Sequence, residues 1–231
     1  MKKKKIYVYA ISKNEEKFAK RWYESVKSAD GIYVLDTGST DNTVKILKEL
    51  GAKVTTKEIK PWRFDVARNE SLKLVPLDAD ICVCIDIDEV ISPNWREKLE
   101  EILENEKVNH VRYIYNWSHD ENKNPKVSFY YEKIHARKNF KWVNPVHEVL
   151  KYTGSNEVWA TTNDIIVDHY PDSSKSRSSY LPLLELSVKE DPYNDRNVHY
   201  LGREYMYYGK LNDEIDTLIY HLSLKSATWK D

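Results

Sequence analysis

The chain has 231 residues, of which 41% are hydrophobic and 32% are charged, which suits one large domain or one domain with a small appendage. The formal net charge of −1, from 36 Lys and Arg against 37 Asp and Glu, argues against a general nucleic-acid binder. No apolar run approaches the ~20 residues of a membrane span, and the apolar segment after the opening lysines is too short for a signal peptide. We therefore expect a soluble, cytoplasmic protein.

The first half of the chain alternates strand-like and helix-like segments. Apolar, β-branched stretches predict buried strands over residues 6–11, 32–35, 52–59 and 81–87. Apolar residues at helical spacing predict helices over residues 15–26, 44–50, 65–74 and 95–103. Gly51 stops the second helix, and Ser92 with Pro93 supplies the N-cap and first turn of the fourth. Repeated units of this size predict an α/β fold, a mostly parallel sheet flanked by helices on both faces.

The pattern changes after residue 108. Short strands rich in aromatic residues predict a mixed extension of the sheet over residues 111–115, 127–134, 140–149 and 165–167. Three amphipathic helices are then predicted over residues 176–189, 195–208 and 213–224. The polar stretch over residues 171–175 is the best boundary, so we expect one domain over residues 1–171 and a helical tail over residues 172–231.

The two cysteines, Cys82 and Cys84, lie two residues apart in the most apolar predicted strand. On a strand they share a face but sit along it, which is a poor arrangement for a disulfide. We expect two packed, reduced thiols, in keeping with a cytosolic compartment.

Three acids within four residues follow at the end of this strand, namely Asp86, Asp88 and Glu89. The pleat of a strand would place Asp86 and Asp88 on one side, at the carboxyl edge of the sheet, where ligands bind in open α/β folds. Their oxygens suit Mg²⁺ or Mn²⁺, particularly when a diphosphate completes the coordination. A solvated acidic turn is the alternative, because a bare Asp-x-Asp is a common sequence.

A second signal is the segment over residues 35–43, in which Asp36 ends the second predicted strand. Gly38 allows a tight turn, and a side chain of residues 39–41 can cap the helix that follows. Capping of the next helix accounts for Asp41 completely. We expect that Asp36 does not cap the helix, so that its carboxylate can accept hydrogen bonds from a nucleoside. Neither a dinucleotide-binding glycine motif nor a P-loop is present in the sequence.

Four motifs occur in one order along the chain: Ile-Ser-Lys-Asn-Glu at 11–15, Val-Leu-Asp-Thr-Gly-Ser-Thr-Asp at 34–41, Phe-Asp-Val-Ala-Arg-Asn at 64–69 and Asp-Ile-Asp-Glu at 86–89. Over residues 6–170 the chain resembles glycosyltransferase family 2, the inverting GT-A enzymes that use nucleotide-sugar donors. It looks most similar to the branch with a tetratricopeptide-like helical tail, which includes S-glycosyltransferases of glycopeptide bacteriocins. The resemblance implies a Rossmann-like GT-A fold and a UDP-sugar donor.

The resemblance also implies which residues hold the nucleotide. Asp36 and Asp41 would hold uracil and ribose, with Asn14 and Glu15 nearby. Arg68 would lie beside the nucleotide and reach a phosphate, although a helix-surface salt bridge is the alternative.

The metal site follows from the same resemblance. Asp86 would point towards the ribose, and Asp88 would bind Mn²⁺ or Mg²⁺ on the diphosphate. The segment over residues 167–170 matches one in which the histidine is often a metal ligand, which places that role on His169.

The segment over residues 142–148 matches the family's Gly-x-x-His-Glu segment, with Asn144 in place of the glycine. Inverting transfer needs one base to deprotonate the acceptor. Glu148 is the first candidate and His147 the second; the alternative is that both pair with neighbouring groups. Seven tryptophans and seventeen tyrosines are mostly packing residues, and none is assigned to a sugar.

The predicted tail carries apolar and small residues at tetratricopeptide-like offsets, namely Val198, Leu201, Gly202, Tyr205, Gly209, Ile215, Leu218 and Leu222. Gly202 permits close helix packing, while Glu214 and Ser226 depart from the pattern. One repeat cannot bury its own apolar stripe well. The stripe would be covered in one of four ways: by other repeats of an array that is incomplete here, by docking on the first domain, by a homodimer contact or by another protein contact. A simple helical cap is an equal alternative.

The function that these features predict is metal-dependent, inverting transfer of a hexose from a UDP-glucose-like donor to a hydroxyl or thiol of a glycan or peptide. The first alternative is a non-catalytic glycan- or peptide-binding module. The second is a nucleotidyltransferase, which would want a glycine-rich basic loop after the first strand, where residues 12–15 are a poor match.

Overall fold

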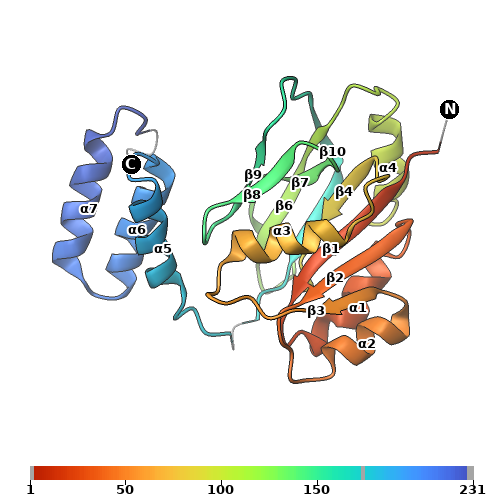
Figure 1. The fold of residues 1–231 in the computed structure, drawn as a ribbon, viewed down its shortest axis with the longest axis horizontal. Coiled ribbons are helices and arrows are strands. Elements are labelled where there is room, and N and C mark those ends of the chain that lie inside the picture. The colour runs from red at the N-terminus through yellow and green to blue at the C-terminus, as the bar shows by residue number, and fades with distance from the viewer. Residues whose placement is uncertain (1–2, 173–174, 228–231) are drawn as a thin grey trace. The chain divides into compact units, whose positions relative to one another are not determined.

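An eight-stranded mixed sheet forms the centre of the first part of the chain in the computed structural model (Figure 1). The structure describes residues 3–172 and 175–227. The strands are β1 Ile6–Ser12, β2 Gly31–Asp36, β3 Lys53–Thr56, β4 Ile81–Cys84, β5 Glu89–Ile91, β6 His110–His119, β7 Pro125–Ala136, β8 Phe140–Val143, β9 Val149–Tyr152 and β10 Trp159–His169. The helices are α1 Glu16–Val26, α2 Thr43–Leu50, α3 Phe64–Leu74, α4 Trp95–Ile102, α5 Tyr180–Glu190, α6 Asp195–Tyr207 and α7 Leu211–Ser223.

The strand order is β3-β2-β1-β4-β7-β6-β10-β5, with β8 and β9 in a separate pair. Strands β1 to β4 are parallel, as the repeated strand–helix units predict. Strand β7 runs antiparallel to both β4 and β6, β10 is parallel to β6, and β5 closes the edge antiparallel to β10. The sheet is therefore parallel in its first half and mixed in its second, as predicted. The strand predicted over residues 140–149 is not part of this sheet: it ends at Val143 and pairs with β9 in the separate sheet.

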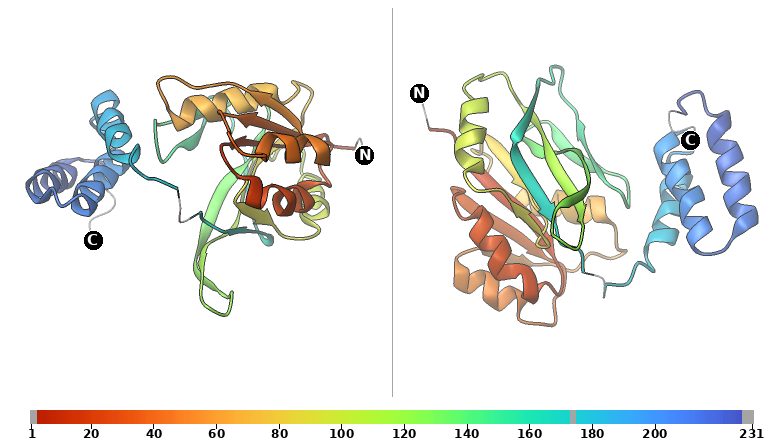
Figure 2. Two further views of the ribbon diagram at one scale, coloured as in Figure 1. Left: turned by 90° about the horizontal axis from the view of Figure 1, so that it is seen from below. Right: turned by 180° about the vertical axis from the view of Figure 1, so that it is seen from behind.

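Alternating residues of the central strands bury two different faces. One core joins Val8 of β1 to Trp22 of α1, Leu47 of α2 and Leu99 of α4, whereas Tyr9 faces the opposite core. That opposite core contains the end of α3 (Figure 2). Helices thus cover both faces, because both faces of these strands are apolar.

The cysteines are buried and free, as expected. Burial raises the pKa of Cys82 to about 12 and that of Cys84 to about 11, so neither thiol ionises at neutral pH.

Two strands of the parallel half end earlier than predicted, and one predicted helix cap is wrong. The strand predicted over residues 52–59 extends only over Lys53–Thr56. The strand predicted over residues 81–87 ends at Cys84, because the carbonyl of Ile85 accepts the indole N–H of Trp22 at 3.1 Å. Helix α4 begins at Trp95, with a left-handed Asn94 as its N-cap. Ser92 does not cap it, because its hydroxyl accepts the backbone N–H of Ile166 instead.

The described residues form two compact units. The first lies within residues 3–62, 66–142 and 150–172, and the second comprises residues 63–65, 143–149 and 175–227. In the second unit, the three predicted helices of the tail are confirmed as α5, α6 and α7. Within the described residues, no helix is both long and apolar enough to cross a membrane.

Candidate active site

The carboxyl ends of β1 and β2 lie side by side and carry the first group of predicted residues. Asp36 is fully buried and accepts hydrogen bonds from the hydroxyl of Ser12 at 3.0 Å and from the backbone N–H groups of Gly38 and Ser39 at 3.1 and 2.9 Å. Asp36 does not cap α2, but it has a local role that the sequence analysis did not predict, since its carboxylate holds the turn in which Gly38 adopts a φ of 111°.

Asn14 and Asp41 join this turn to the loop after β1. Asn14 has a left-handed backbone, and its side-chain oxygen accepts the N–H of Thr40 at 2.8 Å. Asp41 accepts the N–H groups of Thr43 and Glu16 at 2.9 and 3.2 Å, at the beginnings of α2 and α1. Burial opposes the charge, but these hydrogen bonds hold the pKa of Asp41 below its ordinary value.

Glu15 is buried in the same loop, and its backbone N–H donates to the hydroxyl of Thr43 at 2.7 Å. The structure therefore brings together the four predicted residues Asn14, Glu15, Asp36 and Asp41 around one pair of loops.

The acidic segment forms a turn between β4 and β5. Because the strand ends at Cys84, the pleat does not place Asp86 and Asp88 on one side, and that inference is wrong. The turn is instead closed by two hydrogen bonds, from the N–H of Glu89 to the carbonyl of Asp86 at 2.9 Å and from the N–H of Asp86 to the Glu89 carboxylate at 2.8 Å.

Asp86 lies between two cations. Both of its oxygens accept hydrogen bonds from the guanidinium of Arg68, and Nζ of Lys133 lies 3.0 Å from one of them. Although burial disfavours its charge, Arg68 and Lys133 hold the pKa of Asp86 well below its ordinary value. Arg68 does form a salt bridge, but its side chain is buried and not on the surface of the helix.

Lys133 was not identified by the sequence analysis. Its Nζ lies 2.6 and 2.8 Å from the two carboxylate oxygens of Glu89, which also accept the hydroxyl of Tyr115 at 2.9 Å. Although burial disfavours the ammonium, Asp86 and Glu89 hold the pKa of Lys133 well above its ordinary value. The available signal was a lysine that continues the apolar alternation of Val127, Phe129 and Tyr131 on one face of the predicted strand, because a buried charge requires partners.

Asp88 faces the histidine that the resemblance selects. Strand β5 pairs with β10 so that Glu89 is opposite His169, and Nε2 of His169 lies 3.6 Å from a carboxylate oxygen of Asp88. Nδ1 of His169 donates to the carbonyl of Trp117 at 3.1 Å, which leaves Nε2 directed at Asp88. Burial opposes protonation, but the carboxylate raises the pKa of His169 above its ordinary value.

A carboxylate and an imidazole fit a divalent cation, and this donor set suits Mn²⁺ better than Mg²⁺. Among the residues that the structure describes, no group of three or more His, Cys, Asp and Glu side chains could hold a metal ion. Any further ligands of a cation held by Asp88 and His169 would thus come from water or from a phosphate.

The two candidate bases lie in the second unit. His147 has a left-handed backbone, stacks on Tyr200 at 4.2 Å and meets Tyr180 edge-on at 5.6 Å. Burial, with the charges of three arginines led by Arg196, lowers the pKa of His147 to about 4. Glu148 is half-buried.

Asn144, which replaces the glycine of the matching motif, has a φ of 78°. This left-handed conformation is the one that glycine favours and asparagine tolerates. The departure from the motif therefore keeps the backbone conformation that a glycine would allow.

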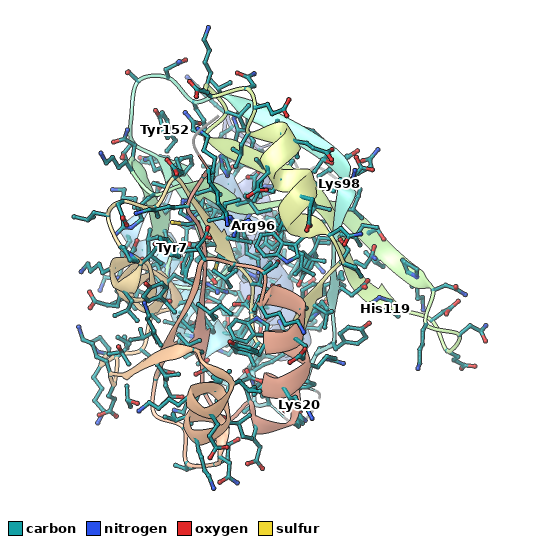
Figure 3. The ribbon with its side chains drawn as sticks, turned by 90° about the vertical axis from the view of Figure 1, so that its right-hand side faces the viewer. Tyr7, Lys20, Arg96, Lys98, His119 and Tyr152 are labelled. Carbon is teal, nitrogen blue, oxygen red and sulfur yellow. The ribbon has the colours of Figure 1, made fainter. Side chains whose placement is uncertain are left out.

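A hollow of about 460 Å³ lies elsewhere, at the turn of the β6–β7 hairpin. It is lined by His119, Asp120, Glu121, Asn122 and Lys126. The hairpin projects beyond the sheet, with His119 near its end (Figure 3). None of the predicted site residues lines this hollow, so we place the candidate site at the strand ends.

The fold defines an α/β protein, with a candidate ligand site at the carboxyl edge of its parallel strands, where two loops and an acid–histidine pair gather. Residues 7–151 match the family model described as glycosyl transferase family 2. Since the match covers more than half of the chain, the chain belongs to this family.

Curated relatives include an uncharacterized glycosyltransferase of Rickettsia typhi, 38% identical over 48% of this chain, and one of Rickettsia bellii, 37% identical over 48%. The chain spans only 36% of the length of each.

Among solved structures, glucosyl-3-phosphoglycerate synthase of Mycobacterium tuberculosis is 26% identical over 48% of this chain and 44% of that one, with a TM-score of 0.42. That enzyme was solved in complex with Mn²⁺ and UDP-glucose, and also with Mg²⁺ and UDP.

Proposed function

We propose that this chain is a metal-dependent, inverting glycosyltransferase of the GT-A type, which transfers a hexose from a UDP-sugar such as UDP-glucose. The acceptor is a hydroxyl or thiol on a glycan or peptide. Family membership supports the reaction class. The observation that carries the proposal is the pairing of Asp88 with His169 at 3.6 Å, beside an acidic turn whose other two acids are already neutralised by buried cations.

Asp88 and His169 would hold the cation, Mn²⁺ or Mg²⁺. When bound, it would offset the negative charge that develops on the departing diphosphate. Asp86 is left out of this ligand set because Arg68 and Lys133 already compensate its charge. Its proposed role is to accept a hydrogen bond from the ribose.

Four residues are proposed to bind the nucleoside: Asn14, Glu15, Asp36 and Asp41. Because Asp36 is fully buried and bonded to its own turn, we propose that it acts by shaping the loop that contacts the nucleoside. Arg68 is proposed to lie beside the diphosphate while it fixes Asp86.

In the transfer itself, the acceptor oxygen or sulfur attacks the anomeric carbon as the bond from that carbon to the diphosphate oxygen breaks, and UDP leaves. The acceptor proton goes to the base, for which Glu148 is our first candidate. His147 is the second, because its ring packs between two tyrosines and its low pKa makes it a weak base.

For the tail, we propose a tetratricopeptide-like role in contact with a protein partner or a second copy, as in the branch with S-glycosyltransferases. Helix α7 supports this with a stripe of exposed apolar residues at helical spacing, namely Leu211, Ile215, Ile219 and Leu222. Light scattering of the purified chain, compared with a variant in which Ile215 and Ile219 are changed to Ser, tests for a homodimer.

The experiment that tests the main proposal is UDP release from a panel of UDP-sugars with Mn²⁺, with Mg²⁺ or with EDTA. We expect slow hydrolysis of one donor that stops in EDTA. Absence of both UDP release and UDP binding in calorimetry would favour a non-catalytic module. Release of pyrophosphate from UTP in the presence of a sugar 1-phosphate, with no release of UDP from any UDP-sugar, would favour a nucleotidyltransferase.

A further inference from the structure

Four aromatic side chains cover one face of the β6–β7 hairpin in the first unit. Tyr115 contacts Phe129, Tyr131 and Trp117, with ring centroids 5.4, 5.0 and 6.4 Å apart. The strand register places Tyr115 opposite Phe129, and Phe129 and Tyr131, two residues apart on β7, share a face. Trp117 lies at a register shift of β6 and joins them through its ring contact with Tyr115. We call Tyr115, Trp117, Phe129 and Tyr131 the aromatic face.

One end of the aromatic face lies against the buried pair of Lys133 and Glu89, and the other end is exposed to solvent. Tyr115 is buried, donates to Glu89, and lies with Tyr131 beneath the ammonium of Lys133. At the outer end, Trp117 is 49% exposed and Phe129 is 43% exposed. The hairpin projects beyond the sheet here, so packing of the core does not account for these two rings (Figures 2 and 3).

Trp117 also contacts the proposed metal site directly. Its indole stacks on the imidazole of His169, with centroids 4.8 Å apart and planes at 30°, and its carbonyl holds Nδ1 of the same ring. One side of the indole is thus covered by a proposed metal ligand, while half of the side chain is accessible to solvent.

The order of the strands separates this face from the nucleotide loops. The loops of Asn14 and Asp36 follow β1 and β2, the acidic turn follows β4, and the aromatic face lies on β7 and β6 beyond it. A ligand that reaches Asp88 from the aromatic face therefore approaches from the side opposite the proposed nucleoside.

We infer that Trp117 and Phe129 form a binding platform for the pyranose ring of a saccharide acceptor. A pyranose has a face of C–H groups that packs on an aromatic ring, while its hydroxyls stay at the rim. This inference rests on the proposed function and selects a glycan acceptor over a peptide.

The test measures binding and transfer with the full chain, UDP and Mn²⁺, using methyl glucosides, maltose, cellobiose and chitobiose as probes. We expect at least one probe to bind, as detected by saturation-transfer NMR, and to accept sugar from the donor. F129A should weaken the apparent Kd of that probe about tenfold and shift the reaction from transfer to hydrolysis. W117A should do the same, with an added loss of metal dependence through His169.

Y130A is the matched control, because Tyr130 is 50% exposed on the opposite face of the same hairpin and bonds to Asn163. It should leave the saccharide Kd unchanged. Equal saccharide affinities in F129A and Y130A would overturn the inference. The inference would also be overturned if the native chain bound UDP but none of the saccharides, and transferred sugar to a Ser- or Cys-containing peptide. Failure of the native chain to hydrolyse any UDP-sugar or to bind UDP would instead reject the proposed function.

Discussion

Nζ of Lys133 lies within 3.0 Å of carboxylate oxygens from both Asp86 and Glu89, and the side chains of Lys133 and Glu89 are buried. One ammonium from β7 thereby neutralises two acids of the turn after β4. Among the ion pairs of the described residues, the third acid of the turn, Asp88, has none with Lys133. It faces His169 instead. Two acids of the turn are in this way held by a lysine, and the third faces a histidine.

Lys133→Met should lower the free energy of unfolding by about 3–5 kcal/mol, because it leaves the buried carboxylate of Glu89 without its cation, while Asp86 keeps only its pair with Arg68. Urea denaturation measures the change. Lys98→Met is the matched control, since Lys98 forms an exposed pair with Glu101, and should change stability by less than about 1 kcal/mol. The double variant with Glu89→Gln should recover part of the loss, and equal destabilisation by both lysine substitutions would contradict the shared-cation interpretation.

Asp88→Asn should abolish the Mn²⁺ dependence of UDP-sugar binding and lower hydrolysis by more than about 100-fold, because an amide is a much weaker ligand than a carboxylate. Calorimetry with UDP, with and without Mn²⁺, measures this. The charge-matched control is Asp164→Asn, at an exposed position of β10. Unchanged turnover in Asp88→Asn would reject the metal assignment.

Glu148→Gln should leave UDP binding intact and lower transfer by about 10²–10⁴-fold, since glutamine has a similar shape but cannot accept the acceptor's proton. Rapid-quench measurement of product with saturating donor separates the two effects. His147→Gln is the comparison: a larger loss of transfer there than in Glu148→Gln would make His147 the base.

Strands β1, β2 and β4 of the parallel half were predictable because they are buried on both faces and read as continuous apolar runs. The same signal failed at the end of β4, since Ile85 and Ile87 are buried although the strand ends at Cys84. Periodicity reports burial, and it does not report which backbone groups bond to each other.

The site was only partly predictable for a related reason. Asp88 and His169 were paired through a resemblance, whereas Lys133 reaches acids 44 and 47 residues away along the chain. No local pattern encodes such a contact. The structural role of Asp36 was not predicted. Its carboxylate accepts hydrogen bonds from the nearby backbone N–H groups of Gly38 and Ser39, and these bonds compete with hydrogen bonds to a ligand.

The buried His135 should make the first unit sensitive to acid. Its Nδ1 donates to the carbonyl of Ala136 and its Nε2 accepts the hydroxyl of Tyr9, each at 2.8 Å, and Tyr9 accepts the indole N–H of Trp142. Burial lowers the pKa of His135 from 6.5 to about 3. The unfolded chain therefore binds one more proton below pH 6.5, so stability is complete above that pH and falls as the pH drops towards 3.

Urea denaturation between pH 7 and 4 should show this contribution as a slope that approaches ~1.4 kcal/mol per pH unit. His135→Gln keeps a donor and an acceptor but does not titrate, so it should flatten the profile by that amount. His147, whose pKa is also lowered, contributes equally to both proteins and cancels in the difference. Parallel profiles for the two proteins would show that His135 is not the group responsible.

Gly202→Ala should destabilise the helical unit, although alanine is the better helix former. A Cβ at this position would lie 2.6 and 2.8 Å from Cδ2 and Cγ of Leu218 on α7, closer than side chains tolerate. Helices α6 and α7 must separate or Leu218 must change rotamer, and we expect a loss of about 1–3 kcal/mol in thermal or urea unfolding.

Leu218→Ala alone should also destabilise, by leaving a cavity. The double variant should be more stable than the sum of the two losses predicts, because the new methyl group occupies space that the smaller side chain vacates. Additive losses would mean that the two helices do not pack through this pair.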